Sequence, residues 1–153
     1  MMETKELANR LNEVITRNYD AVAGYQLAAK KTDDNKLKSM FDQKAFQRQI
    51  FANDLATKVE TMGEKPVEQS SLIADVHRTW MDIKTAFSTG KKEAVLEECI
   101  RGEKASLDEY ETLLQYQIMS EDVRELIDKQ MESITHNLAE LETLEVIADV
   151  QNK

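Results

Sequence analysis

The sequence predicts an all-α protein built as a bundle of four long helices. The chain of 153 residues contains only 4 glycines and 1 proline, and 6% of its residues are aromatic. Glu, Lys, Leu and Ala are abundant, which favours helix almost throughout and argues against a β-rich fold. Apolar residues also recur in steps of three and four over four long stretches, as they do in helices packed along one face. We therefore expect one four-helix-bundle domain over residues 1–153.

The expected long helices cover residues 5–30, 35–62, 92–118 and 121–150. The sequence Thr-Asp-Asp-Asn at 32–35 ends the first helix and supplies N-cap oxygens for the second. Gly63 and Pro66 then stop the second helix, because glycine suits a left-handed C-terminal cap and proline cannot easily continue a helix. An additional amphipathic helix is expected over residues 71–87, with an apolar stripe made of Leu72, Val76, Trp80, Ile83 and Phe87.

The lengths of the three connections predict the order of the helices. Two connections are short, so the helices that they join must be antiparallel. The middle connection, residues 63–90, is far longer than a hairpin needs. It can climb the full height of helices of roughly 27 residues, or roughly 40 Å. Helices two and three would then run parallel, in the up-down-down-up order of ferritin-like bundles. A simple up-down-up-down bundle with an added surface helix is the alternative.

Charge and hydropathy exclude several classes of function. Charged residues make up 32% of the chain and its net charge is −9, which disfavours binding to nucleic acid. No apolar run approaches the roughly 20 residues that span a bilayer, and the first residues do not form a signal peptide. We therefore expect a cytoplasmic protein without a membrane span. The single Cys99 excludes an internal disulfide and is expected to be a small buried side chain.

Polar residues interrupt the apolar seam near the middle of each long helix. Asn18 and Arg48 fall at the same height if the first two helices are antiparallel. Glu103 falls level with Asn137 on the last two helices, and His136 flanks the seam. A charge on a buried seam is costly unless it is paired or bound to a metal. The sequence therefore predicts a buried polar layer that contains Asn18, Arg48, Glu103 and Asn137.

This layer has two interpretations. In the first, Arg48 and Glu103 form a salt bridge that fixes helix register, and no cofactor is present. In the second, the layer holds metal, but di-iron bundles need a Glu on two helices and Glu-x-x-His on the other two. Only Glu103 and His136 fit that pattern, and Arg48 would repel iron. Iron held by Glu103 and His136 stays as an alternative, as does a single metal bound elsewhere by Glu97, Glu98, Glu132 or His136.

The expected crossover helix carries a second candidate. His77, Arg78 and Trp80 lie close together in the sequence. Trp80 falls on the apolar stripe and would anchor that helix to the bundle. His77 and Arg78 would alternatively form the rim of a small pocket or a contact with a partner.

Four motifs together resemble a bacterial four-helix-bundle family of unknown function in the ferritin-like superfamily. They are Asn18-Tyr19-Asp20 with Gly24-Tyr25, Arg48-x-x-Phe51, His77-Arg78-x-Trp80-Met81-Asp82, and Glu97-Glu98-Cys99-Ile100-Arg101-Gly102-Glu103. The resemblance covers nearly the whole chain. It implies a ferritin-like fold and an association with stress response, and it implies no known reaction.

The sequence shows no nucleophile–base set and no glycine-rich phosphate loop. We therefore expect a non-catalytic protein that acts through self-association, as a dimer in the first instance, or through a protein partner. The alternative is a metal-binding ferritin-like protein with iron oxidase or storage activity. A DNA-protecting shell similar to Dps is disfavoured by the net charge of −9 and by the missing ligands.

Overall fold

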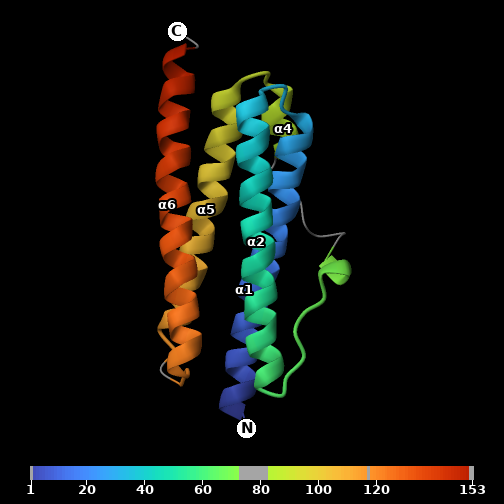
Figure 1. Cartoon of the computed structure of the whole chain (residues 1–153), viewed down its shortest axis with the longest axis vertical. Helices are drawn as coiled ribbons and strands as arrows, with labels where there is room; N and C mark the ends of the chain where they lie inside the picture. The colour runs from blue at the N-terminus through green and yellow to red at the C-terminus, as the bar shows by residue number, and fades with distance from the viewer. Residues whose placement is uncertain (1, 73–82, 117, 152–153) are drawn as a thin grey trace.

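A computed structural model describes residues 2–72, 83–116 and 118–151 of the chain. Its elements are α1 (Met2–Lys31), α2 (Asn35–Thr61), a 3₁₀ turn η1 (Gln69–Leu72), α4 (Ile83–Ser88), α5 (Lys92–Leu114) and α6 (Glu121–Gln151). The four long helices stand side by side, with α1 packed on α2 and α5 packed on α6 (Figure 1). In the described residues, no helix is both long and apolar enough to cross a bilayer.

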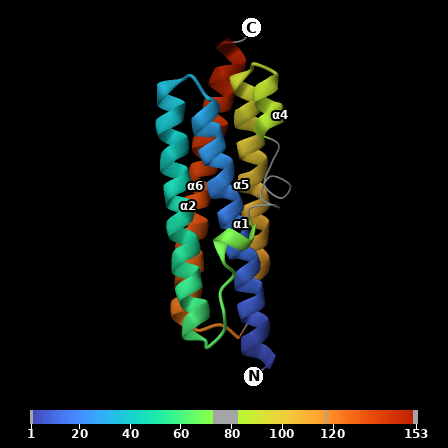
Figure 2. The same ribbon diagram turned by 90° about the vertical axis from the view of Figure 1, so that its right-hand side faces the viewer.

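The order of the helices is up-down-down-up, as predicted. Helix α1 rises from the N-terminus, and α2 descends beside it (Figure 1). Helix α5 starts at the same end of the bundle as α2 and descends in the same direction (Figures 1 and 2). Helix α6 then rises to the C-terminus. The alternative up-down-up-down order is therefore wrong.

Local sequence signals set both ends of α2. The Asp34 carboxylate accepts hydrogen bonds from the backbone amides of Lys36, at 2.9 Å, and Leu37, at 3.1 Å, which makes it the N-cap. Gly63 follows the last turn with a φ of 80°, a left-handed conformation that glycine adopts without steric cost. Both predicted signals are confirmed.

Helix α5 ends at Leu114, four residues before the predicted end at residue 118. The Arg124 side chain explains the early end. Its guanidinium donates to the carbonyl oxygens of Leu114, at 3.3 Å, and Tyr116, at 2.9 Å. The carbonyls at a helix end need such partners. Because α6 supplies them, the chain can leave the helix here without a glycine.

The long connection between α2 and α5 is tied to α1 near its start. The Asn12 side chain accepts from the backbone amide of Val67, at 2.8 Å, and donates to the carbonyl of Lys65, at 3.1 Å. Further along, α4 packs on α1 and α5. The predicted helix over residues 71–87 is represented by the end of η1 and by α4. Its middle lies outside the described residues, as do His77, Arg78 and Trp80.

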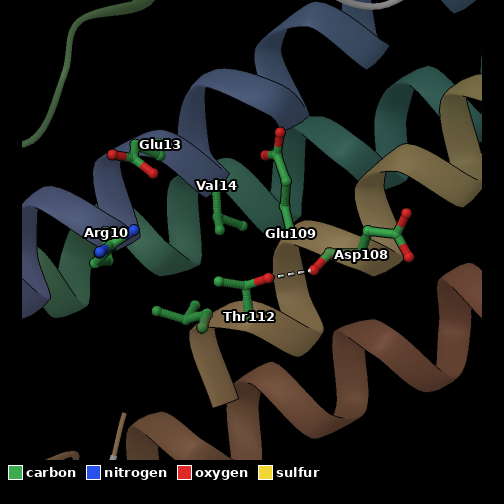
Figure 3. Close-up of a pocket in the computed structure, with 7 residues that line it drawn as sticks. Arg10, Glu13, Val14, Asp108, Glu109 and Thr112 are labelled. Atoms are coloured by element: carbon green, nitrogen blue, oxygen red, sulfur yellow. Dashed lines mark hydrogen bonds between the residues drawn. The ribbon is translucent and has the colours of Figure 1, made fainter. Parts of the chain in front are cut away.

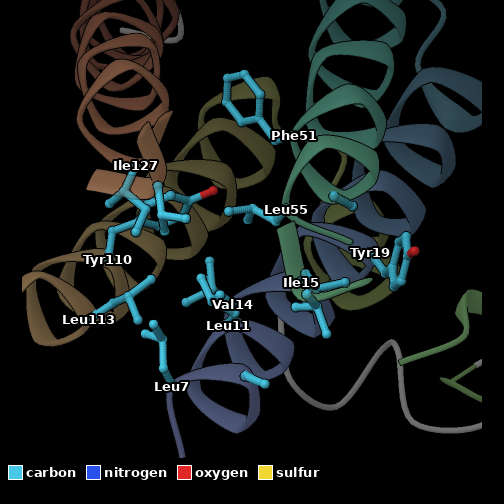
Figure 4. Packing of buried hydrophobic residues seen from close by; sticks show 14 of the residues in the cluster. Leu7, Leu11, Val14, Ile15, Tyr19, Phe51, Leu55, Tyr110, Leu113 and Ile127 are labelled. Atoms are coloured by element: carbon cyan, nitrogen blue, oxygen red, sulfur yellow. The ribbon is translucent and has the colours of Figure 1, made fainter. Parts of the chain in front are cut away.

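The buried apolar side chains form two clusters. The first apolar cluster lies at the end of the bundle where α1 starts, and side chains from all four long helices meet there (Figure 4). It is built around Leu11, Ile15, Leu55, Tyr110 and Ile127. The second apolar cluster lies toward the other end and is built around Ala21, Tyr25, Phe41, Leu96 and Leu141. Along α1, α2 and α5 the two clusters meet near the positions of the buried polar residues Asn18, Arg48 and Glu103.

Candidate functional site

The boundary between the two apolar clusters is a layer of buried polar side chains. Asn18 comes from α1, Arg48 from α2, and Glu103 and Ser106 from α5. Arg48 is 1% exposed and the other three side chains are fully buried. On each helix these residues lie three or four positions from buried apolar residues. They therefore share the face of the helix that points into the core. We call these four residues the central layer.

A salt bridge spans the central layer. One guanidinium nitrogen of Arg48, Nη2, donates to Oε1 of Glu103 and to Oγ of Ser106, both at 2.7 Å. The other, Nη1, donates to Oδ1 of Asn18 at 2.5 Å. Hydrogen bonds in which both groups are charged are among the strongest in proteins. Arg48 therefore links α2 to α1 and α5 at once.

The fourth helix joins this network through a tyrosine. The Asn18 amide donates to the hydroxyl of Tyr110 at 2.8 Å. That hydroxyl donates to Oε1 of Gln130 at 2.6 Å, and Gln130 is buried on α6. The Gln130 amide in turn donates to the carbonyl of Phe51 at 3.3 Å. The chain of bonds thus connects all four long helices through side chains that are shielded from water.

The electrostatics of the layer keep Arg48 charged. Burial is the largest single influence and lowers the pKa of Arg48, but the charge of Glu103, the tyrosines Tyr110 and Tyr25 and the hydrogen bond to Glu103 together outweigh burial, and the resulting pKa is raised. Tyr25 faces the same region, and its pKa is raised well above the ordinary value by burial and then by the charge of Glu103. Within the described part of the chain, Nε of Arg48 has no hydrogen-bond partner. Some bonding capacity of the buried pair is therefore unused, which limits its net contribution to stability.

The structure brings three of the four predicted layer residues together, namely Asn18, Arg48 and Glu103. Asn137 is placed elsewhere. It is half-buried on the side of α6 that faces α2, where its amide donates to Gln47 and its oxygen accepts from Lys44. Lys44 also pairs with Glu140 at 2.6 Å. The structure does not bring Asn137 to the central layer, because matching residues by height along two helices does not determine which side of the helix each one faces.

The sequence prediction missed three members of the network. They are Ser106, Tyr110 as a link to α6, and Gln130. Gln130 had a usable signal, since it is a polar residue on the apolar seam of its helix, as Asn18 is. Ser106 had none, because a serine within a helix commonly bonds its own backbone, and Ser106 does so with the carbonyl of Gly102 at 3.1 Å.

The residues considered for metal do not gather in the layer. Glu103 is fully buried against Arg48, whereas His136 is exposed on α6. Elsewhere, Glu98 pairs with Arg101 at 2.5 Å, and Glu132 is exposed.

Among the described residues, one cluster of three glutamates has carboxylate oxygens close enough together to hold a metal ion. Glu93, Glu97 and Glu145 have carboxylate oxygens within 4.8 Å of one another, on the surface between α5 and α6. Burial and the charge of Glu97 raise the pKa of Glu145. Acidic groups of this kind are common on protein surfaces without an ion.

A surface hollow of about 180 Å³ lies between α1 and α5 (Figure 3). Its walls carry both signs of charge, from Arg10, Glu13, Asp108 and Glu109. Glu109 is paired with Arg17. The volume of the hollow is below the roughly 300 Å³ at which small-molecule pockets begin.

Comparison with known proteins identifies a family and a fold. A family model described as "Domain of unknown function (DUF2383)" matches residues 6–116. No curated protein matches the chain by sequence. The matched span contains Asn18, Arg48 and Glu103.

Two solved structures are similar over nearly the whole chain. One is the crystal structure of "ferritin like, diiron-carboxylate proteins from Bacillus anthracis str. Ames", at 21% identity and a TM-score of 0.73, covering 95% of this chain and 99% of that chain. The other is a DPS protein from Vibrio cholerae O1, described as a member of a superfamily of ferritin-like diiron-carboxylate proteins. It is 15% identical with a TM-score of 0.61, and the match covers 99% of this chain and 92% of that chain. These similarities show that the fold is an all-α ferritin-like bundle.

Proposed function

The chain belongs to the family described as Domain of unknown function (DUF2383), and on that premise we propose that it is a non-catalytic helical protein that acts through protein contacts. In this proposal the contacts are made with a second copy, as a dimer, or with another protein. The bundle centre supplies register and rigidity, and the outer faces of the helices supply the binding surface. The observation that carries the proposal is the salt bridge between Arg48 and Glu103, 2.7 Å long and almost completely buried.

The residues of the central layer do not fit a di-iron centre. Both similar crystal structures are described as diiron-carboxylate proteins, and centres of this type in ferritin-like bundles use four Glu and two His. Among the described residues, the central layer offers one carboxylate, Glu103, and Arg48 already occupies it. A guanidinium in the cavity would repel iron, and moving it aside would strand a buried charge. No chemistry at the centre is therefore assigned to iron.

Exposed apolar side chains support a role in protein contacts. Phe46 is 69% exposed and Ile50 is 41% exposed, one turn apart on the outer face of α2. Single exposed apolar side chains are ordinary, whereas neighbouring ones mark candidate interaction sites. Further exposed apolar residues are Ile118, Val146, Ile147 and Val150.

A second candidate function has one observation in its favour. The carboxylates of Glu93, Glu97 and Glu145 converge on the surface. A divalent cation would reduce the repulsion that helps raise the pKa of Glu145. This candidate is a metal-binding ferritin-like protein whose ion lies on the surface.

Metal content separates the two candidates. Untagged protein is incubated with Fe(II) under air, and bound metal and iron oxidation are measured for three forms: wild type, Glu103→Gln, and Glu97→Gln with Glu145→Gln. We expect no stoichiometric metal and no oxidation above buffer. About two irons per chain, lost in Glu103→Gln, would overturn the proposal and establish a di-iron centre. One metal per chain, lost only in the double variant, would favour the surface site. Sedimentation over a range of concentrations then tests the dimer.

A further inference from the structure

The last turns of α6 carry an exposed apolar stripe. Val146 is 59% exposed, Ile147 is 48% exposed and Val150 is 65% exposed. At about 100° per residue these three side chains share one side of the helix. The opposite side is turned into the bundle by Leu141 and Ala148, which are 0% and 7% exposed. We call the outward side the α6 terminal face, and its other members are Ala139 and Thr143.

Folding does not account for the three side chains at the centre of this face. Their exposure means that they contribute little to the core. Val and Ile are also weaker helix formers than Ala, Leu or Glu, so they do not serve the helix itself. Helix α6 extends past the turns at that end of the bundle (Figures 1 and 2), and the three apolar side chains are exposed there. The stripe is therefore open to a partner from outside.

The charged side chains in the last turns of α6 are all acidic. Residues 138–151 contain four acidic side chains and no lysine or arginine. The acidic residues are Glu140, Glu142, Glu145 and Asp149. By the same angular spacing, Glu142 and Asp149 lie along one edge of the stripe, and Glu145 lies beyond them, beside Glu97 of α5. Glu140 lies along the other edge, where it is paired with Lys44. The pKa of Glu145 is raised by burial and by the nearby charge of Glu97, as expected where carboxylates crowd together.

We infer that the α6 terminal face docks an amphipathic helix of another protein, whose apolar stripe is bordered by lysine or arginine. Two such helices would pack side by side along their apolar stripes, with opposite charges meeting at the edges. A second copy of the chain offering the same face would bring acid against acid and is disfavoured. The inference rests on the proposed function and specifies its partner.

A fluorescent synthetic peptide tests the inference. The probe is a helix with leucine at every third or fourth position and lysine beside the leucines, and its control has the same composition in an order that breaks the stripe. Binding is followed by fluorescence anisotropy at low salt and at about 0.15 M salt. We expect the amphipathic peptide to bind and the control peptide of scrambled sequence to bind at least about tenfold more weakly.

Matched variants locate the site. The variant Val146→Ser/Ile147→Ser/Val150→Ser should weaken binding at least about tenfold. The variant Glu142→Gln/Glu145→Gln/Asp149→Asn should weaken it similarly and reduce its salt dependence. One control should bind as wild type does: Glu125→Gln/Asp128→Asn/Glu132→Gln, which removes three exposed acids elsewhere on α6. The three replaced apolar side chains and Glu142 are exposed, whereas Glu145 and Asp149 are partly buried, so circular dichroism checks that each variant is folded.

Three results would overturn the inference. The serine variant could bind the peptide as tightly as wild type does, the scrambled peptide could bind as tightly as the amphipathic one, or the protein could form a dimer that the serine substitutions abolish. The last result would assign the face to a second copy. These results differ from the one that would contradict the proposed function. Stoichiometric iron bound at Glu103 would contradict the proposed function regardless of whether the peptide binds.

Discussion

Glu103 neutralises the buried guanidinium of Arg48 in the central layer. Replacing Glu103 therefore measures the free-energy cost of leaving Arg48 buried without a counter-charge. We expect Glu103→Ala to lower the free energy of unfolding by about 3–5 kcal/mol, because Arg48 would stay buried and charged. Urea denaturation measures the change. Glu111→Ala makes the same substitution at an exposed position of the same helix and should change stability by less than about 0.5 kcal/mol. Equal effects for the two variants would show that Arg48 escapes to solvent.

Tyr110 makes stability depend on pH in the alkaline range. Burial is the main reason that its pKa is raised to about 12, whereas the phenol of an unfolded chain titrates near pH 10. The unfolded state therefore loses this proton first as the pH rises. The contribution of Tyr110 is fully present below about pH 10 and is lost as the pH approaches about 12.

The expected loss across that pH range is about 2–3 kcal/mol for Tyr110. Chemical denaturation at several pH values measures it. Tyr110→Phe should be less stable at neutral pH, because the Asn18 amide and Gln130 each lose a partner, yet its stability should fall less steeply above pH 10. Parallel pH profiles for the variant and the wild type would contradict the assignment to Tyr110.

At the scale of the helix, Asp34 anchors the start of α2. Asp34→Ala should destabilise the protein by about 1 kcal/mol, since two backbone amides lose their acceptor. Asp34→Asn should cost less at neutral pH, because an amide oxygen still caps. Thermal or urea unfolding gives both values, and Asp33→Ala is the neighbouring control. If Asp33→Ala costs as much, charge at this turn and not capping stabilises α2.

Acid should remove the same cap. The pKa of Asp34 is lowered, first by the hydrogen bond from Lys92 and then by the backbone bond from Leu37. Its contribution is therefore present above the pKa of the unfolded carboxyl, near 3.9, and is lost as the pH falls through the lower folded value. Below that pH, wild type and Asp34→Asn should converge in stability.

The helices themselves were predictable because their signals are local. Apolar periodicity, the capping sequence before residue 35 and Gly63 each act within a few residues, and the length of the long connection determined the helix order. The end of α5 was not predictable. It depends on Arg124 of the next helix, which reaches back to the carbonyls at the end of α5.

The central layer was likewise predictable in part. A charge on an apolar seam requires a partner, so Arg48 and Glu103 could be matched from the sequence. Which side chain of α6 completes the network could not be matched, because that depends on the rotation of α6 about its axis. Asn137 faces Gln47 and Lys44, while Gln130 meets Tyr110 two turns earlier.

For the whole molecule, the central layer divides one long core into two apolar clusters. An apolar core of similar volume is often as stable as a buried salt bridge, and it tolerates more than one alignment of the helices. A slip of α2 or α5 by one turn would separate Arg48 from Glu103 and leave both charges buried. The layer is therefore expected to select one register at little or no gain in stability.

Replacing the layer by apolar residues separates these two effects. We expect Asn18→Leu/Arg48→Met/Glu103→Leu to leave the free energy of unfolding unchanged or to raise it by about 1–4 kcal/mol, whereas Glu103→Leu alone should lower it by about 3–5 kcal/mol. The triple variant should also show more than one set of backbone amide signals in nuclear magnetic resonance spectra, since the helices can settle in more than one register. A triple variant as unstable as Glu103→Leu would mean that the salt bridge itself holds the bundle together. A stable triple variant with a single set of signals would mean that the apolar clusters and the turns select the register without it.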